Sequence, residues 1–289
     1  MPENRVSEFQ PIKAKKYFHT TRRNGRKVIR DIKHRMLGMP WFEVEARDCF
    51  FASYPRSGNT WLRHVLFFYL NDDAANVDML ELDSFCPIID GIDLKYHLGT
   101  KKGAAKRFIK THEFGANYMT KGKIVYLVRD GRDAVWSYHK YYRGYDRGPK
   151  DFDTFLDQAL AGKVGYKSWH QNVASWLELN ESPNFMLLKF EDMVQDPVSM
   201  FKKILTHLEI EIDEDRVLRA TRKSNPERVS QTFQSDLRVK KTSGSGAGQG
   251  GTVERWRTAY TQEQLLRFEE KAGDVLHQLG YTLSTEANP

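Results

Sequence analysis

Short apolar runs of β-strand length alternate with helical patterns along most of this chain. The strand-like runs cover residues 49–54, 107–110, 123–128 and 185–189. Helical patterns cover residues 60–70, 133–142, 151–161, 166–179, 197–208, 212–223 and 262–279. Strands that alternate with helices favour parallel pairing, because a helix is the usual crossover between two parallel strands. The predicted fold class is therefore α/β, with a central parallel sheet flanked by helices on both faces.

The first 40 residues differ from the rest of the chain in composition. They are polar and basic, and between residues 13 and 35 ten lysines and arginines are opposed by Asp31 alone. We predict a basic arm over residues 1–40 and a single domain over residues 41–289. The arm is interpreted either as a solvated segment or as a weak contact with an anionic surface, such as a lipid headgroup or an anionic acceptor.

Composition limits the compartment and the chemistry. The net charge of +7 favours anionic partners without choosing among them. The first residues lack the apolar stretch of a signal peptide, and no apolar run is long enough to span a bilayer, so we expect a cytoplasmic protein. Cys49 and Cys86 form no disulfide framework, and Cys49 is expected to be a buried thiol. No cluster has the spacing of metal ligands, so no metal is expected.

The strongest motif is the segment SYPRSGNTW at residues 53–61, between a predicted strand and a predicted helix. In a parallel sheet this junction lies at the carboxyl edge, where the backbone N–H groups of the helix start favour an anion. Gly58 allows close approach of the backbone, and Arg56 supplies a fixed positive charge. Further donors are Ser57, Asn59 and Thr60. The segment is predicted to hold a phosphate, although it lacks the lysine of a Walker A loop.

This segment resembles the 5′-phosphosulfate loop of the sulfotransferases that use 3′-phosphoadenosine 5′-phosphosulfate (PAPS). The resemblance implies the sulfotransferase variant of the P-loop nucleotide-kinase fold, and it covers residues 48 to 280. In well-known cytosolic members the position of Arg56 is a lysine. Arginine keeps the charge and serves as an electrostatic stabiliser. By the same resemblance, Trp61 is expected to lie against the adenine.

A second motif, Lys110-Thr111-His112, follows the strand predicted at residues 107–110. Alone it carries little information. After the phosphate loop it resembles the catalytic segment of the sulfotransferases, which implies that His112 is the general base. An imidazole has the right pKa range to accept a proton from a hydroxyl during attack. Lys110 is expected to stabilise negative charge on the sulfuryl or bridging oxygen.

A third motif, RDGRDAVWS at residues 129–137, again joins a strand to a helix. It resembles the 3′-phosphate site of the family, and the resemblance implies that Arg129 and Ser137 bind that phosphate. Taken without the other motifs, Arg129 would more readily be interpreted as the partner of Asp130 or Asp133 in a surface ion pair.

Weaker resemblances concern the adenine and the glycine loop. Thr221 matches an adenine-contacting threonine, whereas Phe190 stands where a tyrosine precedes Glu-Asp in the family. Gly251 matches a loop glycine that closes over the 3′-phosphate. The residues before it, Gln249 and Gly250, replace the usual basic residues, so the contribution of the segment 238–251 to that contact stays open.

The acceptor is not fixed by the sequence, and neither is the oligomeric state. A hydroxyl or an amine on a small molecule, a lipid or a saccharide remains open. The pocket is expected from the loops at residues 80–105, 143–170 and 228–250. Aromatic candidates for its lining are Phe85, Tyr138, Tyr141, Tyr142 and Trp169, although aromatic residues more often belong to a core. Gln262 and Leu266 depart from a dimerisation motif of many cytosolic members.

Two other functions are compatible with parts of the sequence. A P-loop kinase would share the fold but needs a Walker lysine and magnesium. A basic module that binds nucleic acid or a membrane would need only the positive charge, and its affinity would collapse with salt. The three motifs in order favour the PAPS-dependent enzyme, with no specific nucleic acid as a partner.

Overall fold

A computed structural model describes residues 44–89, 106–115, 117–225, 228–229, 231–232 and 252–286, without the side chains of residues 117 and 118. The chain divides into two units, Met1–Trp41 and Phe42–Pro289. The predicted basic arm, including residues 13–35, and the loop at residues 238–251 lie outside the described residues.

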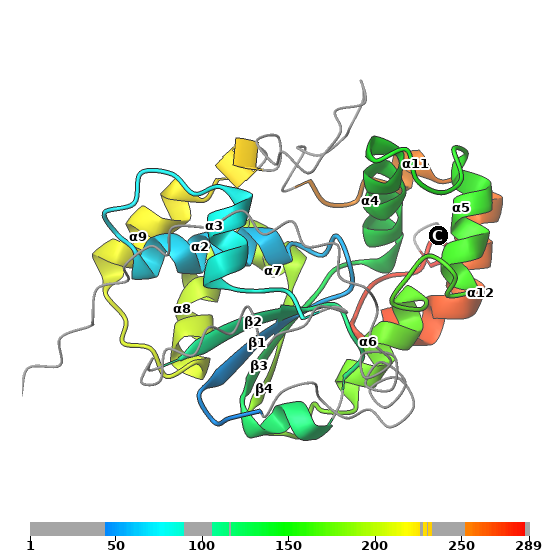
Figure 1. The fold of residues 1–289 in the computed structure, drawn as a ribbon. Coiled ribbons are helices and arrows are strands. Elements are labelled where there is room, and N and C mark those ends of the chain that lie inside the picture. Colours follow the sequence, from blue (N-terminus) through cyan, green and yellow to red (C-terminus); the bar gives the residue numbers. More distant parts are fainter. Residues whose placement is uncertain are drawn as a thin grey trace, which may run out of the picture. The chain divides into compact units, whose positions relative to one another are not determined.

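Within the described residues, four parallel strands form the sheet, in the spatial order β2-β1-β3-β4 (Figure 1). The strands are β1 (Asp48–Ala52), β2 (Arg107–Thr111), β3 (Lys123–Val128) and β4 (Phe185–Lys189). In the register of the sheet, Phe51 of β1 pairs with Lys110 of β2 and with Val125 of β3. The predicted parallel sheet is confirmed, and all four strands end at the same edge.

Helices cover both faces of the sheet (Figure 1). Those on the first face are α2 (Asn59–Leu70), α3 (Met79–Phe85), α7 (Phe190–Gln195), α8 (Pro197–His207) and α9 (Glu214–Lys223). Those on the second face are α4 (Gly131–Gly144), α5 (Phe152–Leu160), α6 (Trp169–Leu177), α11 (Trp256–Ala259) and α12 (Gln262–Gln278). The 3₁₀ turn η2 (Asn117–Lys121) leads into β3. The α/β fold class is therefore confirmed.

Side chains that alternate along the strands divide the apolar residues into two cores, one on each face of the sheet. The core that packs against α2, here named the α2-side core, includes Phe51 and Leu127. The core that packs against α4, here named the α4-side core, includes Phe50 and Tyr126. This division follows from the pleat, which sends successive side chains to opposite faces. Cys49 is fully buried in the α2-side core, as predicted, and its burial raises the pKa of the thiol to about 12.

Helix starts follow the capping chemistry of the sequence. Asp196 accepts a hydrogen bond from the backbone N–H of Ser199, and Pro197 occupies the first turn of α8, as expected. Ser168 forms a capping box with Gln171, so α6 begins at Trp169 rather than at residue 166. The short helices α3, α7 and α11 were not predicted, because each has too few residues to show a helical period.

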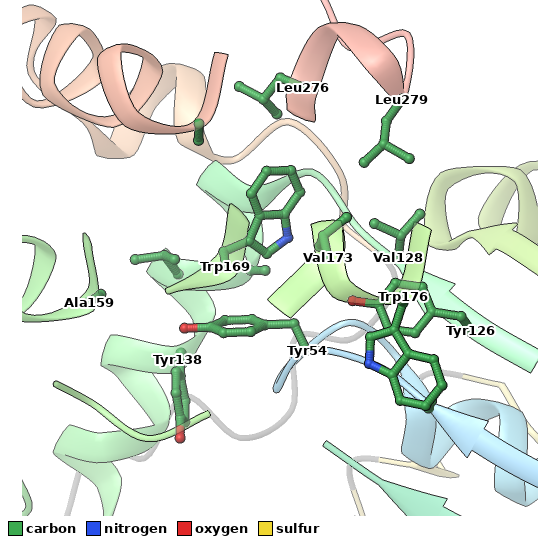
Figure 2. Packing of buried hydrophobic residues seen from close by; sticks show 14 of the residues in the cluster. Tyr54, Tyr126, Val128, Tyr138, Ala159, Trp169, Val173, Trp176, Leu276 and Leu279 are labelled. Atoms are coloured by element: carbon green, nitrogen blue, oxygen red, sulfur yellow. The ribbon is translucent and has the colours of Figure 1, made fainter. Parts of the chain in front are cut away.

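The α4-side core is rich in aromatic residues. The ring of Tyr126 stacks on Trp176 at a centroid distance of 5.2 Å, and Tyr54 meets Tyr138 edge to face at 6.0 Å (Figure 2). Trp169 is 2% exposed in this same core, whereas Phe85 belongs to the α2-side core across the sheet. These aromatic residues therefore pack as core, and Phe85 and Trp169 do not line one common pocket.

The Tyr54 hydroxyl gives a first testable prediction. It is fully buried and has no hydrogen-bond partner among the residues that the structure describes. An unsatisfied buried hydroxyl costs about 1–3 kcal/mol, so Tyr54→Phe should leave the free energy of unfolding unchanged or raise it. Tyr126→Phe is the matched control, because its hydroxyl donates to Asn172 Oδ1 at 3.1 Å and its loss should destabilise. Urea unfolding measures both; a clear destabilisation by Tyr54→Phe would show that its hydroxyl has a partner.

Within the described ranges, no helix is long and apolar enough to cross a membrane. The same part of the chain contains no group of three or more histidine, cysteine, aspartate or glutamate side chains placed to hold a metal ion.

Candidate active site

Each of the three predicted motifs lies at the carboxyl end of a different strand. Residues 53–59 follow β1, His112 follows β2 and Arg129 follows β3. Phe190 begins α7 directly after β4. Because all four strands are parallel, these residues share one edge of the sheet, where α/β folds bind their ligands.

The loop after β1 presents backbone rather than a side chain at the start of α2. Gly58 is the N-cap residue with φ 99°, and among the described residues no side chain caps the helix. A Cβ atom on Gly58 would lie 2.5 Å from the Phe190 ring, so no larger residue fits there without displacing that ring. The first N–H groups of α2 are thereby left to meet an anion, in a cradle that glycine alone can form.

Asn59 anchors this loop to the strand before it. Its side-chain nitrogen donates to the carbonyl of Phe51 at 2.9 Å and to Ser53 Oγ at 3.2 Å. The amide that we expected to face a phosphate is therefore engaged within the loop. Ser57 differs, because its buried Oγ has no hydrogen-bond partner among the described residues and is available as a donor.

Thr60 and Trp61 lie in the first turn of α2, and both are half-buried. The Trp61 ring meets Phe190 edge to face at 6.0 Å. The centroid of the Phe190 ring also lies 4.6 Å from the guanidinium carbon of Arg129, which follows β3. Phe190 thus contacts both the start of α2 and the end of β3.

Arg56 lies across the loop toward α4. Its Nε donates to Ser137 Oγ at 3.2 Å, and its guanidinium lies 5.1 Å from the centroid of the Tyr141 ring. Burial lowers the pKa of Arg56, and the positive charge of Arg129 acts in the same direction. An arginine stays charged under such a shift, so the arrangement gathers positive charge at the loop and favours a bound anion.

Arg129 is 8% exposed and is fixed by several partners. One terminal nitrogen donates to the Arg56 carbonyl at 3.2 Å, and the other donates to Asp133 at 3.2 Å and to the Thr252 carbonyl at 2.8 Å. Its Nε is buried without a partner among the described residues. The ion pair between Arg129 and Asp133, considered from the sequence, is therefore present. Arg129 and Ser137 also both contact Arg56, so the structure brings these two residues to the same place.

His112 is held by the loop after β1. Its Nδ1 lies 2.6 Å from the Ser53 carbonyl oxygen. A carbonyl oxygen can only accept, so Nδ1 carries the hydrogen and the basic lone pair resides on Nε2. The Tyr166 ring packs edge to face against the imidazole at a centroid distance of 5.3 Å. Lys110 is half-buried one residue before the end of β2, and its backbone N–H donates to the Pro87 carbonyl at 2.8 Å.

Thr221 lies on α9, and its hydroxyl donates to the carbonyls of Val217 at 2.9 Å and Leu218 at 3.1 Å in its own helix. Gly251 lies outside the described residues.

The structure also shows supporting contacts that the sequence did not reveal. Besides its ion pair with Arg129, Asp133 accepts from the Trp256 N–H at 3.0 Å and so attaches the segment after the glycine loop to α4. Glu191 accepts from the Asp130 N–H at 3.0 Å and from the Tyr281 hydroxyl at 2.8 Å. Burial raises the pKa of Glu191. No local period marks the contacts with Trp256, Asp130 and Tyr281, because each joins residues far apart in the chain.

The model of the family described as "Sulfotransferase domain" matches residues 46–280. This chain belongs to the sulfotransferase family. Sulfotransferase 1B1 of Mus musculus is 31% identical over 255 residues, covering 79% of this chain and 82% of the relative. Luciferin sulfotransferase of Photinus pyralis is 25% identical over 264 residues, covering 79% of this chain and 71% of the relative.

Two solved structures with bound PAP share the fold. Mouse sulfotransferase SULT7A1 complexed with PAP matches with a TM-score of 0.63 and 25% identity, covering 81% of this chain and 85% of that one. Retinol dehydratase in complex with androsterone and inactive cofactor PAP matches with a TM-score of 0.70 and 22% identity, covering 90% and 88%. The predicted sulfotransferase fold and the predicted PAPS-dependent sulfotransferase class are confirmed.

Proposed function

We propose that this sulfotransferase transfers the sulfuryl group of PAPS to a hydroxyl of a small-molecule acceptor, with His112 as the general base. The observation that carries the proposal is the hydrogen bond between His112 Nδ1 and the Ser53 carbonyl, at 2.6 Å. It fixes the tautomer whose Nε2 accepts a proton, on the loop that also forms the phosphate cradle.

His112 supports the reaction by taking the acceptor proton as the new bond forms. The acceptor oxygen bonds to sulfur while the bond from sulfur to the bridging oxygen of the phosphosulfate breaks, and 3′,5′-ADP leaves. The proton passes to His112 Nε2. Arg56 and Lys110 are assigned to the negative charge that develops on the sulfuryl and bridging oxygens. An amine acceptor that attacks as the free base would need this proton transfer less.

The donor fits the groups present at the sheet edge. Ser57 Oγ and Arg129 Nε are buried donors without partners among the described residues. Leaving a buried donor unsatisfied costs free energy unless a bound ligand accepts its hydrogen bond. At the N-terminus of α2, which Gly58 precedes, no side chain of the described residues caps the helix. We assign the 5′-phosphosulfate to Ser57, Gly58, Thr60 and Arg56, the 3′-phosphate to Arg129 and Ser137, and the adenine to Trp61. The roles of Thr221 and Gly251 toward the nucleotide remain proposals from the resemblance.

A small-molecule acceptor is supported by the relatives. One relative is named for luciferin, and one structure of the same fold holds androsterone. Beside His112, Tyr166 offers an aromatic surface to an apolar ring. Lipid and saccharide acceptors would have to reach the same imidazole.

The direct experiment is transfer of label from [³⁵S]PAPS to a panel of phenols, steroids, primary alcohols and arylamines. We expect labelled product and an equal amount of 3′,5′-ADP, with phenols and steroids ahead of amines. Labelling of amines alone, with no hydroxyl acceptor modified, would contradict the proposed acceptor class.

A further inference from the structure

The inner face of α6 is attached to the segment that carries His112. Three neighbouring side chains of the helix each hydrogen-bond to that segment. Asn172 Nδ2 donates to the His112 carbonyl at 3.0 Å, and Trp176 Nε1 donates to the Glu113 carbonyl at 2.9 Å. Ser175 Oγ accepts from the Gly115 N–H at 3.1 Å. The segment is therefore held by α6, whereas the pairing of β2 with β1 ends at Thr111 in the part of the chain that the structure describes.

Asn172 has a central place in this attachment. It is fully buried, and its Oδ1 accepts from the Tyr126 hydroxyl of β3 at 3.1 Å. Its amide nitrogen also reaches the carbonyl of Tyr166 at 3.5 Å. One side chain thus connects the sheet, the backbone of His112 and the loop whose aromatic ring packs against the imidazole.

The loop that carries Tyr166 adopts an unfavourable backbone. Tyr166 and Lys167 have φ values of 51° and 57°, in the left-handed region that residues with a Cβ atom rarely occupy. Such a conformation persists where surrounding contacts hold it, and strain of this kind gathers at functional sites. The bonds of Asn172 and the capping box of Ser168 with Gln171 are such contacts.

From these contacts we infer that Asn172 is a positioning residue for His112. By holding the His112 carbonyl, it keeps the imidazole oriented with Nδ1 on the Ser53 carbonyl and with Nε2 as the basic nitrogen. This inference rests on the proposed function for its effect on turnover. Its effect on the tautomer does not depend on that function.

The first test reads the tautomer by ¹⁵N NMR of the imidazoles, with the His112 signals identified by their absence in His112→Ala. In its neutral form, wild-type His112 should show the ¹⁵N chemical shifts of a protonated Nδ1 and an unprotonated Nε2. In Asn172→Ala the chemical shifts of the two nitrogens should move toward the averaged values of an imidazole in free exchange between its two tautomers. Tyr126→Phe is the matched control, because it removes the third bond of Asn172 but leaves the amide donors, and it should keep the wild-type signature.

Unchanged His112 signals in Asn172→Ala would overturn the inference, and so would equal changes in Tyr126→Phe. Asn172 is buried, so the alanine variant could fold poorly. Asn172→Asp is the second variant, because it keeps the volume and the acceptor for Tyr126 while it removes the N–H donors. A thermal melt with 3′,5′-ADP confirms that each variant retains a folded nucleotide site.

The second test is a double-mutant cycle with PAPS and 2-naphthol as the probe acceptor. Asn172→Ala should lower kcat about 10- to 100-fold, with the affinity for 3′,5′-ADP unchanged within about twofold. Added to His112→Ala, it should cause no further loss, because it acts through His112. Additive losses would overturn the positioning role. Full activity of His112→Ala would instead refute the proposed base, and the NMR result would then stand by itself.

Discussion

His112→Ala is expected to lower kcat about 10²–10⁴-fold while the affinity for 3′,5′-ADP stays nearly unchanged. Loss of a general base typically has this magnitude, and the imidazole is assigned to the acceptor proton rather than to the nucleotide. Single-turnover transfer from PAPS to a hydroxyl acceptor, with nucleotide binding measured separately, gives both quantities.

His277→Ala is a suitable control for that experiment. His277 lies on α12 with about half of its side chain exposed and pairs with Glu286 at 3.0 Å, so its loss should leave turnover unchanged. A near-normal kcat of His112→Ala on a hydroxyl acceptor would show that this histidine is structural. With an amine acceptor the loss should be smaller, because a free amine is already nucleophilic and can attack before it loses its proton, whereas a hydroxyl needs its proton removed as the bond forms.

Arg129→Ala is expected to discriminate between nucleotides. If Arg129 binds the 3′-phosphate, its loss should weaken 3′,5′-ADP by about 2–5 kcal/mol, because a buried charge loses its partner. The affinity for 5′-AMP, which lacks that phosphate, should barely change. Arg56→Ala should weaken both nucleotides, because both carry the 5′-phosphate. Isothermal titration calorimetry of each nucleotide with each variant gives the four dissociation constants to be compared.

Arg129 also has structural partners, so its truncation needs a control. Removing it leaves the buried Asp133 without its cation. Burial already raises the pKa of Asp133. Arg129→Lys retains a positive charge but lacks the planar guanidinium fork. Compared with Arg129→Ala, it should recover the stability of the fold more fully than the preference for 3′,5′-ADP over 5′-AMP. Equal losses for both nucleotides in Arg129→Ala would place the 3′-phosphate elsewhere, for example on lysines of the segment 238–251.

Local sequence patterns predicted the parts of this fold that depend on local physics. The strands β3 and β4 were predicted with their observed bounds, because apolar runs of that length are buried from both sides in a parallel sheet. The start of α8 followed from Asp196 and Pro197. The shared edge of the three motifs followed from the order of strands and helices alone.

Partners distant in sequence could not be predicted in this way. Asn172 and His112 are 60 residues apart, and nothing in the pattern of α6 marks Asn172 as different from a core residue. The hydrogen bonds from the Asn59 amide to Phe51 and Ser53 could likewise not be predicted. A side chain with several donors does not reveal from sequence whether it faces a ligand or its own loop.

We propose that the edge of this sheet binds the nucleotide through two phosphate sites that need no magnesium. Chemical unfolding with and without 3′,5′-ADP in the presence of EDTA measures this binding directly. At a ligand concentration of about 100 times Kd, we expect the free energy of unfolding to rise by roughly 2.7 kcal/mol. An unfolding curve that does not move with millimolar 3′,5′-ADP, or that moves only after magnesium is added, would contradict it.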